Sequence, residues 1–252
     1  MGPSAGIRSG HGTCERRLRI ATYNRAVHPT GNEGRFRDLT IDAFASRLAS
    51  SDPVPGGGSA SAVAAALGAS LVTMVASLTT GRPKYADHEP MLAWALETGD
   101  RLSDRFLAIA DEDAEAYAGF AAALKMPRET EGEIAARTEA MQAAARGASE
   151  VPLRCLEACL DLVGAAEALA GRSNPNAASD VDVAALLGEA AARGAAANVL
   201  INLPSTGDPE FEGATTVRVT ELLSAIEDLA SSAHQAVASG ERRDPIEPAV
   251  RA

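Results

Sequence analysis

The sequence predicts an all-α fold, a single domain built as a bundle of about six to seven mostly long antiparallel helices. Apolar residues recur at steps of three and four through most of the chain, and no segment shows a convincing alternating strand pattern. Alanine dominates one segment after another, whereas only 4% of residues are aromatic. We therefore expect closely packed helices around a core of small and aliphatic side chains.

Composition excludes some functions and favours one compartment. The 252 residues are 46% hydrophobic, which is enough for a sizeable core. A formal net charge of -11 argues against a nucleic-acid surface, which needs basic residues to replace counterions. Cys14, Cys155 and Cys159 form no recognisable disulfide or metal framework, and the N-terminus shows no signal peptide. The prediction is a cytoplasmic protein without a nucleic-acid partner.

The predicted helical domain covers residues 39–240. Residues 1–38 are rich in Gly, Arg and polar side chains without a hydrophobic period, so we expect a disordered leader. Residues 241–252 are rich in Pro and charge, and we expect a flexible tail.

The first two helices follow from a cap and from an uncharged segment. Thr40 is a suitable N-cap for a helix that ends near Ser50. A second helix is expected from residue 60 to about residue 80. No charge occurs from Val54 to Gly81, but Gly, Ala, Ser and Thr fill most of this segment. We therefore predict a buried helix in close contact with its neighbours rather than a membrane span.

A long third helix is predicted from about Glu89 to Leu124, closed by Pro127. Its apolar face consists of Leu92, Leu96, Gly99, Leu102, Phe106, Ile109, Tyr117, Phe120 and Leu124. The remaining helices are expected at about 129–147, 150–171, 179–203 and 210–239.

The first candidate site is the turn Gly56-Gly57-Gly58-Ser59 that leads directly into the second helix. Glycines let a backbone approach a ligand closely, and free N–H groups at a helix start favour an anion. A plain flexible connection between two helices explains the same residues. The turn is no phosphate-binding P-loop, because no Gly-Lys-Ser/Thr follows.

The second candidate is Asp113, within the acidic run of residues 111–115. Steps of four from Ile109 lead to Asp113 and then to Tyr117, so this carboxylate falls inside the apolar face. A desolvated carboxylate has a raised pKa and is typical of a general acid or base. A buried structural ion pair, with Lys84 or an arginine, is an equal alternative.

The third candidate lies at the two ends of the helix expected at 179–203. Ser179 and Asp182 fit a reciprocal capping pair, and the helix dipole favours Asp180 near the start. Asn198 and Asn202 lie four residues apart on one face of an otherwise apolar helix end. They could line a polar cleft for a heterocycle or merely tie neighbouring segments together. His234 lacks companion ligands at metal spacing, so no metal site is predicted.

Five segments together resemble the cyclodeaminase/cyclohydrolase family, which includes the C-terminal half of formiminotransferase-cyclodeaminase and stand-alone methenyltetrahydrofolate cyclohydrolases. The resemblance covers about residues 39–239. The order and spacing of the segments carry it: Ser51-Asp52-Pro53-Val54-Pro55-Gly56-Gly57-Gly58-Ser59-Ala60, Gly81-Arg82-Pro83-Lys84-Tyr85, Asp111-Glu112-Asp113-Ala114-Glu115-Ala116-Tyr117, Ser179-Asp180 and Asn198-Val199-Leu200-Ile201-Asn202-Leu203.

The resemblance implies an all-α homodimer formed by helix packing, with its site near the dimer interface. It implies formation or hydrolysis of 5,10-methenyltetrahydrofolate, with a tetrahydrofolate derivative as substrate and no tightly bound cofactor. Asp113 would be the acid/base group. Substrate-binding residues would be Gly56, Gly57, Gly58, Ser59, Lys84, Tyr85, Asp180, Asn198 and Asn202. A separate formiminotransferase is a candidate partner. The alternative function is a non-catalytic helical homodimer that binds folate or a protein.

Overall fold

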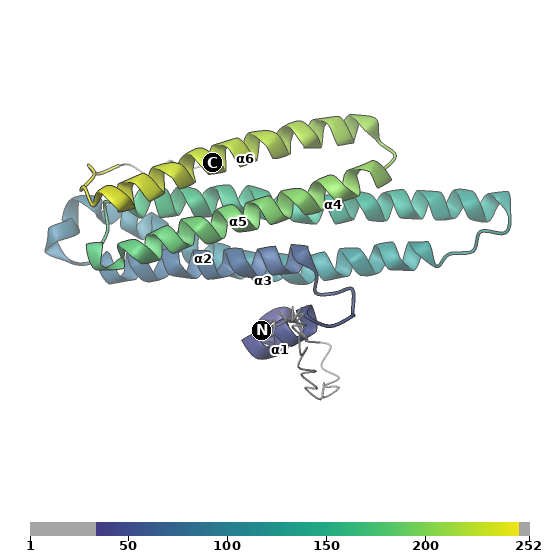
Figure 1. Cartoon of the computed structure of the whole chain (residues 1–252), viewed down its shortest axis with the longest axis horizontal. Helices are drawn as coiled ribbons and strands as arrows, with labels where there is room; N and C mark the ends of the chain where they lie inside the picture. Colours follow the sequence, from purple (N-terminus) through teal and green to yellow (C-terminus); the bar gives the residue numbers. More distant parts are fainter. Residues whose placement is uncertain (1–33, 247–252) are drawn as a thin grey trace, which may run out of the picture. The chain divides into compact units, whose positions relative to one another are not determined.

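The computed structural model describes residues 34–246, and every regular element in that part of the chain is a helix (Figure 1). Five long helices, α2 to α6, run side by side as a bundle, which confirms the all-α prediction. The elements are η1 (Phe36–Asp38), α1 (Ile41–Leu48), α2 (Gly57–Thr79), η2 (Pro83–His88), α3 (Glu89–Leu124), α4 (Glu131–Leu169), η3 (Pro175–Ala177), α5 (Ala178–Asn202), η4 (Leu203–Ser205) and α6 (Pro209–Ser239).

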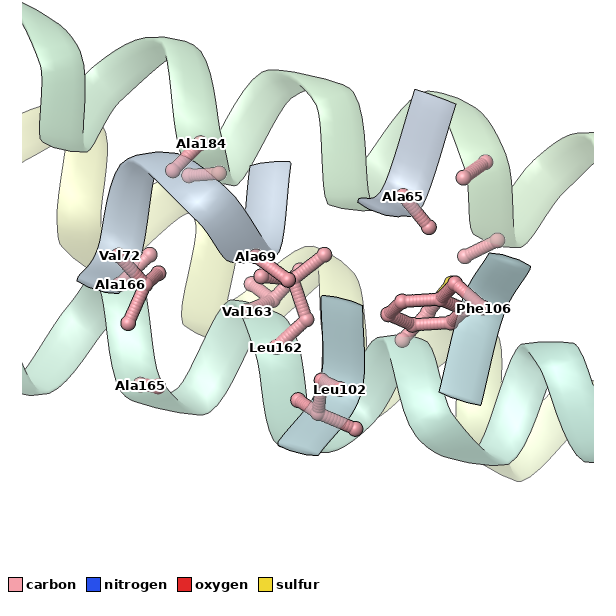
Figure 2. Packing of buried hydrophobic residues seen from close by; sticks show 14 of the residues in the cluster. Ala65, Ala69, Val72, Leu102, Phe106, Leu162, Val163, Ala165, Ala166 and Ala184 are labelled. Carbon is pink, nitrogen blue, oxygen red and sulfur yellow. The ribbon is translucent and has the colours of Figure 1, made fainter. Parts of the chain in front are cut away.

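Small residues let the long helices approach closely, as their composition predicts. A Cβ atom added at Gly68 of α2 would lie 3.2 Å from the backbone oxygen of Ala184 in α5. Figure 2 shows part of the buried core between these helices, in which Phe106 of α3 lies near Ala65 of α2. Cys155 and Cys159 are buried in this core and carry free thiols.

One helix, α4, replaces the two helices that were predicted at 129–147 and 150–171. Pro152 lies inside it and cannot donate the usual hydrogen bond to the carbonyl of Ala148. The side-chain Nδ2 of Asn202 donates to that carbonyl instead, at 2.9 Å. The helix therefore continues through the proline because α5 supplies the missing donor.

The start of α5 differs from the predicted cap. The helix begins at Ala178, and its N-cap residue Ala177 provides no side-chain hydrogen bond, so Ser179 is not the N-cap. A 3-10 turn precedes the helix, and the side chain of Asn174 caps that turn. Asp182 pairs with His234 of α6 rather than with the helix start.

Both predicted boundaries of the helical domain move outward. Phe36 is buried, and its backbone N–H donates to Oδ1 of Asp111 at 2.7 Å, so residues 36–38 are folded rather than disordered. At the other end, the backbone N–H of Arg243 donates to Gly171 O at 3.0 Å, and its guanidinium pairs with Glu167. The start of the predicted flexible tail is therefore held against α4. Residues 1–33 and 247–252 of the leader and tail lie outside the described residues.

Two helical segments are long and apolar enough to cross a membrane by length and composition alone. They are α2 and the segment Pro175–Ser205, with 50% and 44% of their most apolar windows buried inside the bundle. Core helices of soluble proteins meet the same criteria, so this similarity is weak evidence for a membrane span.

Candidate functional site

The start of α2 lies directly against Asp113 of α3. A Cβ atom at Gly58 would fall 2.1 Å from Oδ1 of Asp113, closer than any real carbon contact. Gly57 faces α5 instead, where its Cβ would lie 3.5 Å from Nδ2 of Asn198. Three predicted elements, the glycine turn, Asp113 and Asn198, thus meet at one end of the bundle.

The Asp113 carboxylate is partly buried and is hydrogen-bonded by one neighbour. The hydroxyl of Ser59 lies 2.9 Å from Oδ2 of Asp113 and 3.0 Å from the backbone oxygen of Ala110. Burial raises the pKa of the Asp113 carboxyl, and hydrogen bonds from the Ser59 side chain and backbone oppose the rise only in part. Among residues 34–246, no cationic group contributes to this shift.

Asp113 and Lys84 do not form an ion pair in this structure. Lys84 lies in η2, beyond the far end of α2, with its Nζ 5.2 Å from the centre of the Tyr85 ring. The 23 residues of α2 separate the glycine turn from that end by roughly 33 Å at 1.5 Å per residue.

Asp180 also lies far from Asp113, because it belongs to the first turn of α5 whereas Asn198 belongs to the last. The backbone N–H of Asn174 donates to Oγ1 of Thr79 at 3.1 Å, which fixes the start of α5 beside the end of α2. The predicted site residues therefore form two groups at opposite ends of the bundle. Lys84, Tyr85 and Asp180 belong to one group, and the glycine turn, Asp113, Asn198 and Asn202 belong to the other.

The two asparagines of α5 play different parts. Nδ2 of Asn198 donates to Gly194 O at 2.8 Å, and the side chain faces the glycine turn. Nδ2 of Asn202 is shared between Asn198 O and Ala148 O. Asn202 thus ties α5 to α4, which fits the structural alternative, whereas Asn198 lies beside the candidate site.

His234 pairs with Asp182, so its side chain has a partner at the interface between α5 and α6. Across residues 34–246, no group of three His, Cys, Asp or Glu side chains comes together as metal ligands.

These features define a class of protein: an all-helical bundle with a partly buried carboxyl, whose pKa is raised, beside the first turn of a helix. Residues 40–221 match the formiminotransferase-cyclodeaminase family, and the chain belongs to that family. This confirms the family predicted from the five segments.

Relatives of known name agree with that membership. The chain is 40% identical to the methenyltetrahydrofolate cyclohydrolase of Methylorubrum extorquens over 172 residues, which cover 68% of this chain and 83% of that protein. It is 35% identical to the formimidoyltransferase-cyclodeaminase of Rattus norvegicus over 205 residues, which cover 81% of this chain but 38% of that protein. The chain thus corresponds to only part of the rat protein.

A solved structure shares the fold. The crystal structure of formiminotetrahydrofolate cyclodeaminase from Thermotoga maritima superimposes with a TM-score of 0.73 at 29% sequence identity. The match covers 81% of this chain and 98% of that one. The two proteins therefore share the helical bundle over most of their length.

Proposed function

We propose that this protein is a folate-dependent one-carbon enzyme, a methenyltetrahydrofolate cyclohydrolase and/or a formimidoyltetrahydrofolate cyclodeaminase. The names of the relatives support both activities. The observation that carries the proposal is Asp113, a partly buried carboxyl with a raised pKa beside the glycine turn. A carboxyl with a raised pKa beside a ligand position is suited to exchange a proton with a substrate.

Both reactions pass through a tetrahedral carbon between N5 and N10 of tetrahydrofolate. In hydrolysis, the Asp113 carboxylate removes a proton from the water that adds to the methenyl carbon. The neutral carboxyl then gives this proton to N5 as the carbon–N5 bond breaks, and the hydroxyl proton on the same carbon passes to solvent as the C=O bond forms, which leaves 10-formyltetrahydrofolate. In cyclodeamination, N10 attacks the formimino carbon, and the N10 proton moves to the imino nitrogen. Asp113 donates a second proton to that nitrogen as its bond to carbon breaks, which releases ammonia and leaves 5,10-methenyltetrahydrofolate. The carboxylate also stabilises the positive charge of the methenyl compound.

Absorbance spectroscopy tests the proposed chemistry. Adding the protein to 5,10-methenyltetrahydrofolate should remove the near-ultraviolet absorbance of that compound, because hydrolysis destroys the chromophore. Release of ammonia from 5-formiminotetrahydrofolate measures the cyclodeaminase activity. A spectral shift without loss of the chromophore would favour the alternative, a helical homodimer that binds folate without catalysis.

A second copy of the chain is the proposed partner, and the exposed face of α2 and α5 is the proposed interface. Large apolar side chains are exposed on both helices: Leu67, Met74 and Leu78 of α2, and Val183, Leu186 and Leu200 of α5. The steps between them are seven and four on α2, and three and fourteen on α5, which place the side chains of each helix along one face, as in helices that pack against another helix pair. A two-fold axis perpendicular to α2 would reverse the second copy. Lys84, Tyr85 and Asp180 of one subunit would then lie near Asp113 of the other.

Mixed dimers test this arrangement. Asp113→Asn and Lys84→Ala should each impair turnover as pure proteins. Mixed by refolding in equal amounts, they should recover about a quarter of wild-type turnover, because half of the dimers then hold one intact site of two. No recovery would place both residues in the same subunit's site, and full turnover by Lys84→Ala alone would remove Lys84 from the site.

The proposed substrate is a tetrahydrofolate derivative, and the proposed mechanism uses no tightly bound cofactor or metal. A cytoplasmic location suits the two buried free thiols, Cys155 and Cys159. A separate formiminotransferase would supply the formimino substrate.

A further inference from the structure

The apolar face of α3 continues past the point where α2 stops covering it. Leu102, Phe106 and Ile109 on this face are at most 1% exposed. Asp113 comes next, opposite Gly58 in the first turn of α2. One turn further along α3, Tyr117 is 42% exposed, and Leu124 near the helix end is 44% exposed. The face is thus buried up to Asp113 and open beyond it.

The open part belongs to a hairpin of two helices. In Figure 1, the end of α3 and the start of α4 extend past the other helices of the bundle. Within residues 34–246, no hydrogen bond or ring contact involves Tyr117. Tyr117 is also absent from the side chains that pack against the main core. An aromatic ring is therefore presented beside the candidate acid/base group without a structural task inside the subunit.

We propose that Tyr117 is a substrate-binding residue that packs against a planar aromatic ring of the folate, and this inference rests on the proposed function. Side chains at positions i and i+4 of a helix are neighbours, about 5–6 Å apart at their Cβ atoms. A ring stacked on Tyr117 therefore lies within reach of the Asp113 carboxyl. The stacked folate ring also excludes water from one side of the Asp113 carboxyl.

The position of Tyr117 on α3 favours the substrate over a second copy as the molecule that contacts its ring. The ring lies on the same face of α3 as Asp113, one turn away, so a ligand at the carboxyl lies within reach of Tyr117. The apolar steps assigned to the dimer lie on α2 and α5 instead. Measurement of the oligomeric state separates the two occupants.

Three variants test the role of Tyr117 with 5,10-methenyltetrahydrofolate as substrate. Tyr117→Ala should raise KM about tenfold or more, the range of a lost stacking contact, and change kcat by less than about threefold. Tyr117→Phe keeps the ring and should stay near wild type. Leu124→Ala is the matched control, because its side chain is equally exposed on the same face but two turns further from Asp113.

A binding measurement separates failure of this inference from failure of the proposed function. Calorimetric titration with 5-formyltetrahydrofolate would compare Asp113→Asn with the Asp113→Asn/Tyr117→Ala double variant, and the double variant should bind about tenfold more weakly. A chain that binds this probe through Tyr117 but turns over neither folate contradicts the proposed function and leaves the inference standing. Unchanged KM and affinity in Tyr117→Ala would overturn the inference. A raised KM that accompanies dissociation of the subunits would also overturn it, since Tyr117 would then belong to the dimer interface.

Discussion

Two neighbouring carboxylates on α3 have opposite environments. Glu112 accepts hydrogen bonds from Arg105 and Arg154, the latter at 2.7 Å, and these bonds lower its pKa although burial alone would raise it. For Asp113, the next residue, burial raises the pKa, and within residues 34–246 the hydrogen bonds that oppose the rise come from Ser59 alone. Hydrogen bonds from two arginines thus favour the ionised form of Glu112, whereas burial favours the neutral form of Asp113.

The comparison shows that position on the helix decides the chemistry, not residue type. Consecutive residues of an α-helix point about 100° apart, so Glu112 faces the arginines while Asp113 faces the start of α2. Glu112 links α3 to α4 through Arg154 and serves stability. Glu112 is therefore a structural carboxylate, and Asp113, the next residue, is a candidate functional one. Variants of the two residues and of their neighbours test this distinction.

Removing the charge of each carboxylate is the strongest test. Asp113→Asn should lower turnover about 100- to 10,000-fold, because the amide cannot transfer the proton. Glu112→Gln, its matched control, should keep turnover within about threefold of wild type. Steady-state kinetics with 5,10-methenyltetrahydrofolate would measure both, with circular dichroism to check the fold. Near-normal turnover in Asp113→Asn would end the assignment of Asp113 as the acid/base group.

Adjacent glycines provide the second test. Gly58→Ala places a carbon where the Asp113 carboxylate lies, so the carboxylate must move and turnover should fall on the order of 100-fold, as for other small displacements of reacting groups. Gly57→Ala adds the same carbon at an ordinary distance from Asn198 and should retain most of its turnover. Equal turnover in the two variants would mean that the position of the Asp113 carboxylate is not important for the reaction.

Much of this arrangement could be predicted from local pattern. The apolar steps place α3 at its observed bounds, and the same steps place Asp113 on the inner face. The continuity of α4 through Pro152 could not be predicted, because the donor that replaces the lost hydrogen bond is Asn202, 50 residues further along the chain. Hydrophobic periodicity identifies which face of a helix is covered, but not which distant side chain supplies a missing hydrogen bond.

The sequence also could not predict which end of the bundle each candidate site residue occupies. The sequence shows that Lys84 and Asp180 flank helix ends, but not which ends lie together. The antiparallel packing of α2 and α5 separates Asp180 from Asp113, whereas Lys84 is separated from Asp113 because it precedes the start of α3 and Asp113 lies far along that helix. The role of Ser59 was hidden for the same reason: its hydroxyl reaches Asp113 across 54 positions of sequence.

Removal of the Ser59 hydroxyl should change the pH dependence of turnover by altering the pKa of Asp113. This hydroxyl stabilises the ionised form of Asp113, so Ser59→Ala should raise the pKa of Asp113 further. If the carboxylate acts as the base, the acidic limb of the kcat/KM profile moves to higher pH. The measurement is the pH dependence of turnover in wild type and Ser59→Ala. A limb that stays in place would show that another group controls the profile.

The smallest expected effects concern stability, and they have opposite signs for the two carboxylates. The lowered pKa of Glu112 means that its contribution is present above the unfolded pKa of about 4.3 and is lost as pH falls through the folded pKa. Glu112→Gln should therefore cost about 1 kcal/mol or less at pH 7, and the difference from wild type should shrink in acid.

For Asp113 the raised pKa reverses the sign. Its contribution is present below the unfolded pKa of about 3.9 and is lost as pH rises through the folded pKa, because the buried ionised form is unfavourable. Asp113→Asn should thus unfold at the same or a higher urea concentration than wild type at pH 7, and its advantage should diminish in acid. Urea unfolding of both variants across this pH range measures the two slopes. Slopes of the same sign would mean that the two neighbouring carboxylates share one environment, and the distinction between a structural Glu112 and a reactive Asp113 would fail.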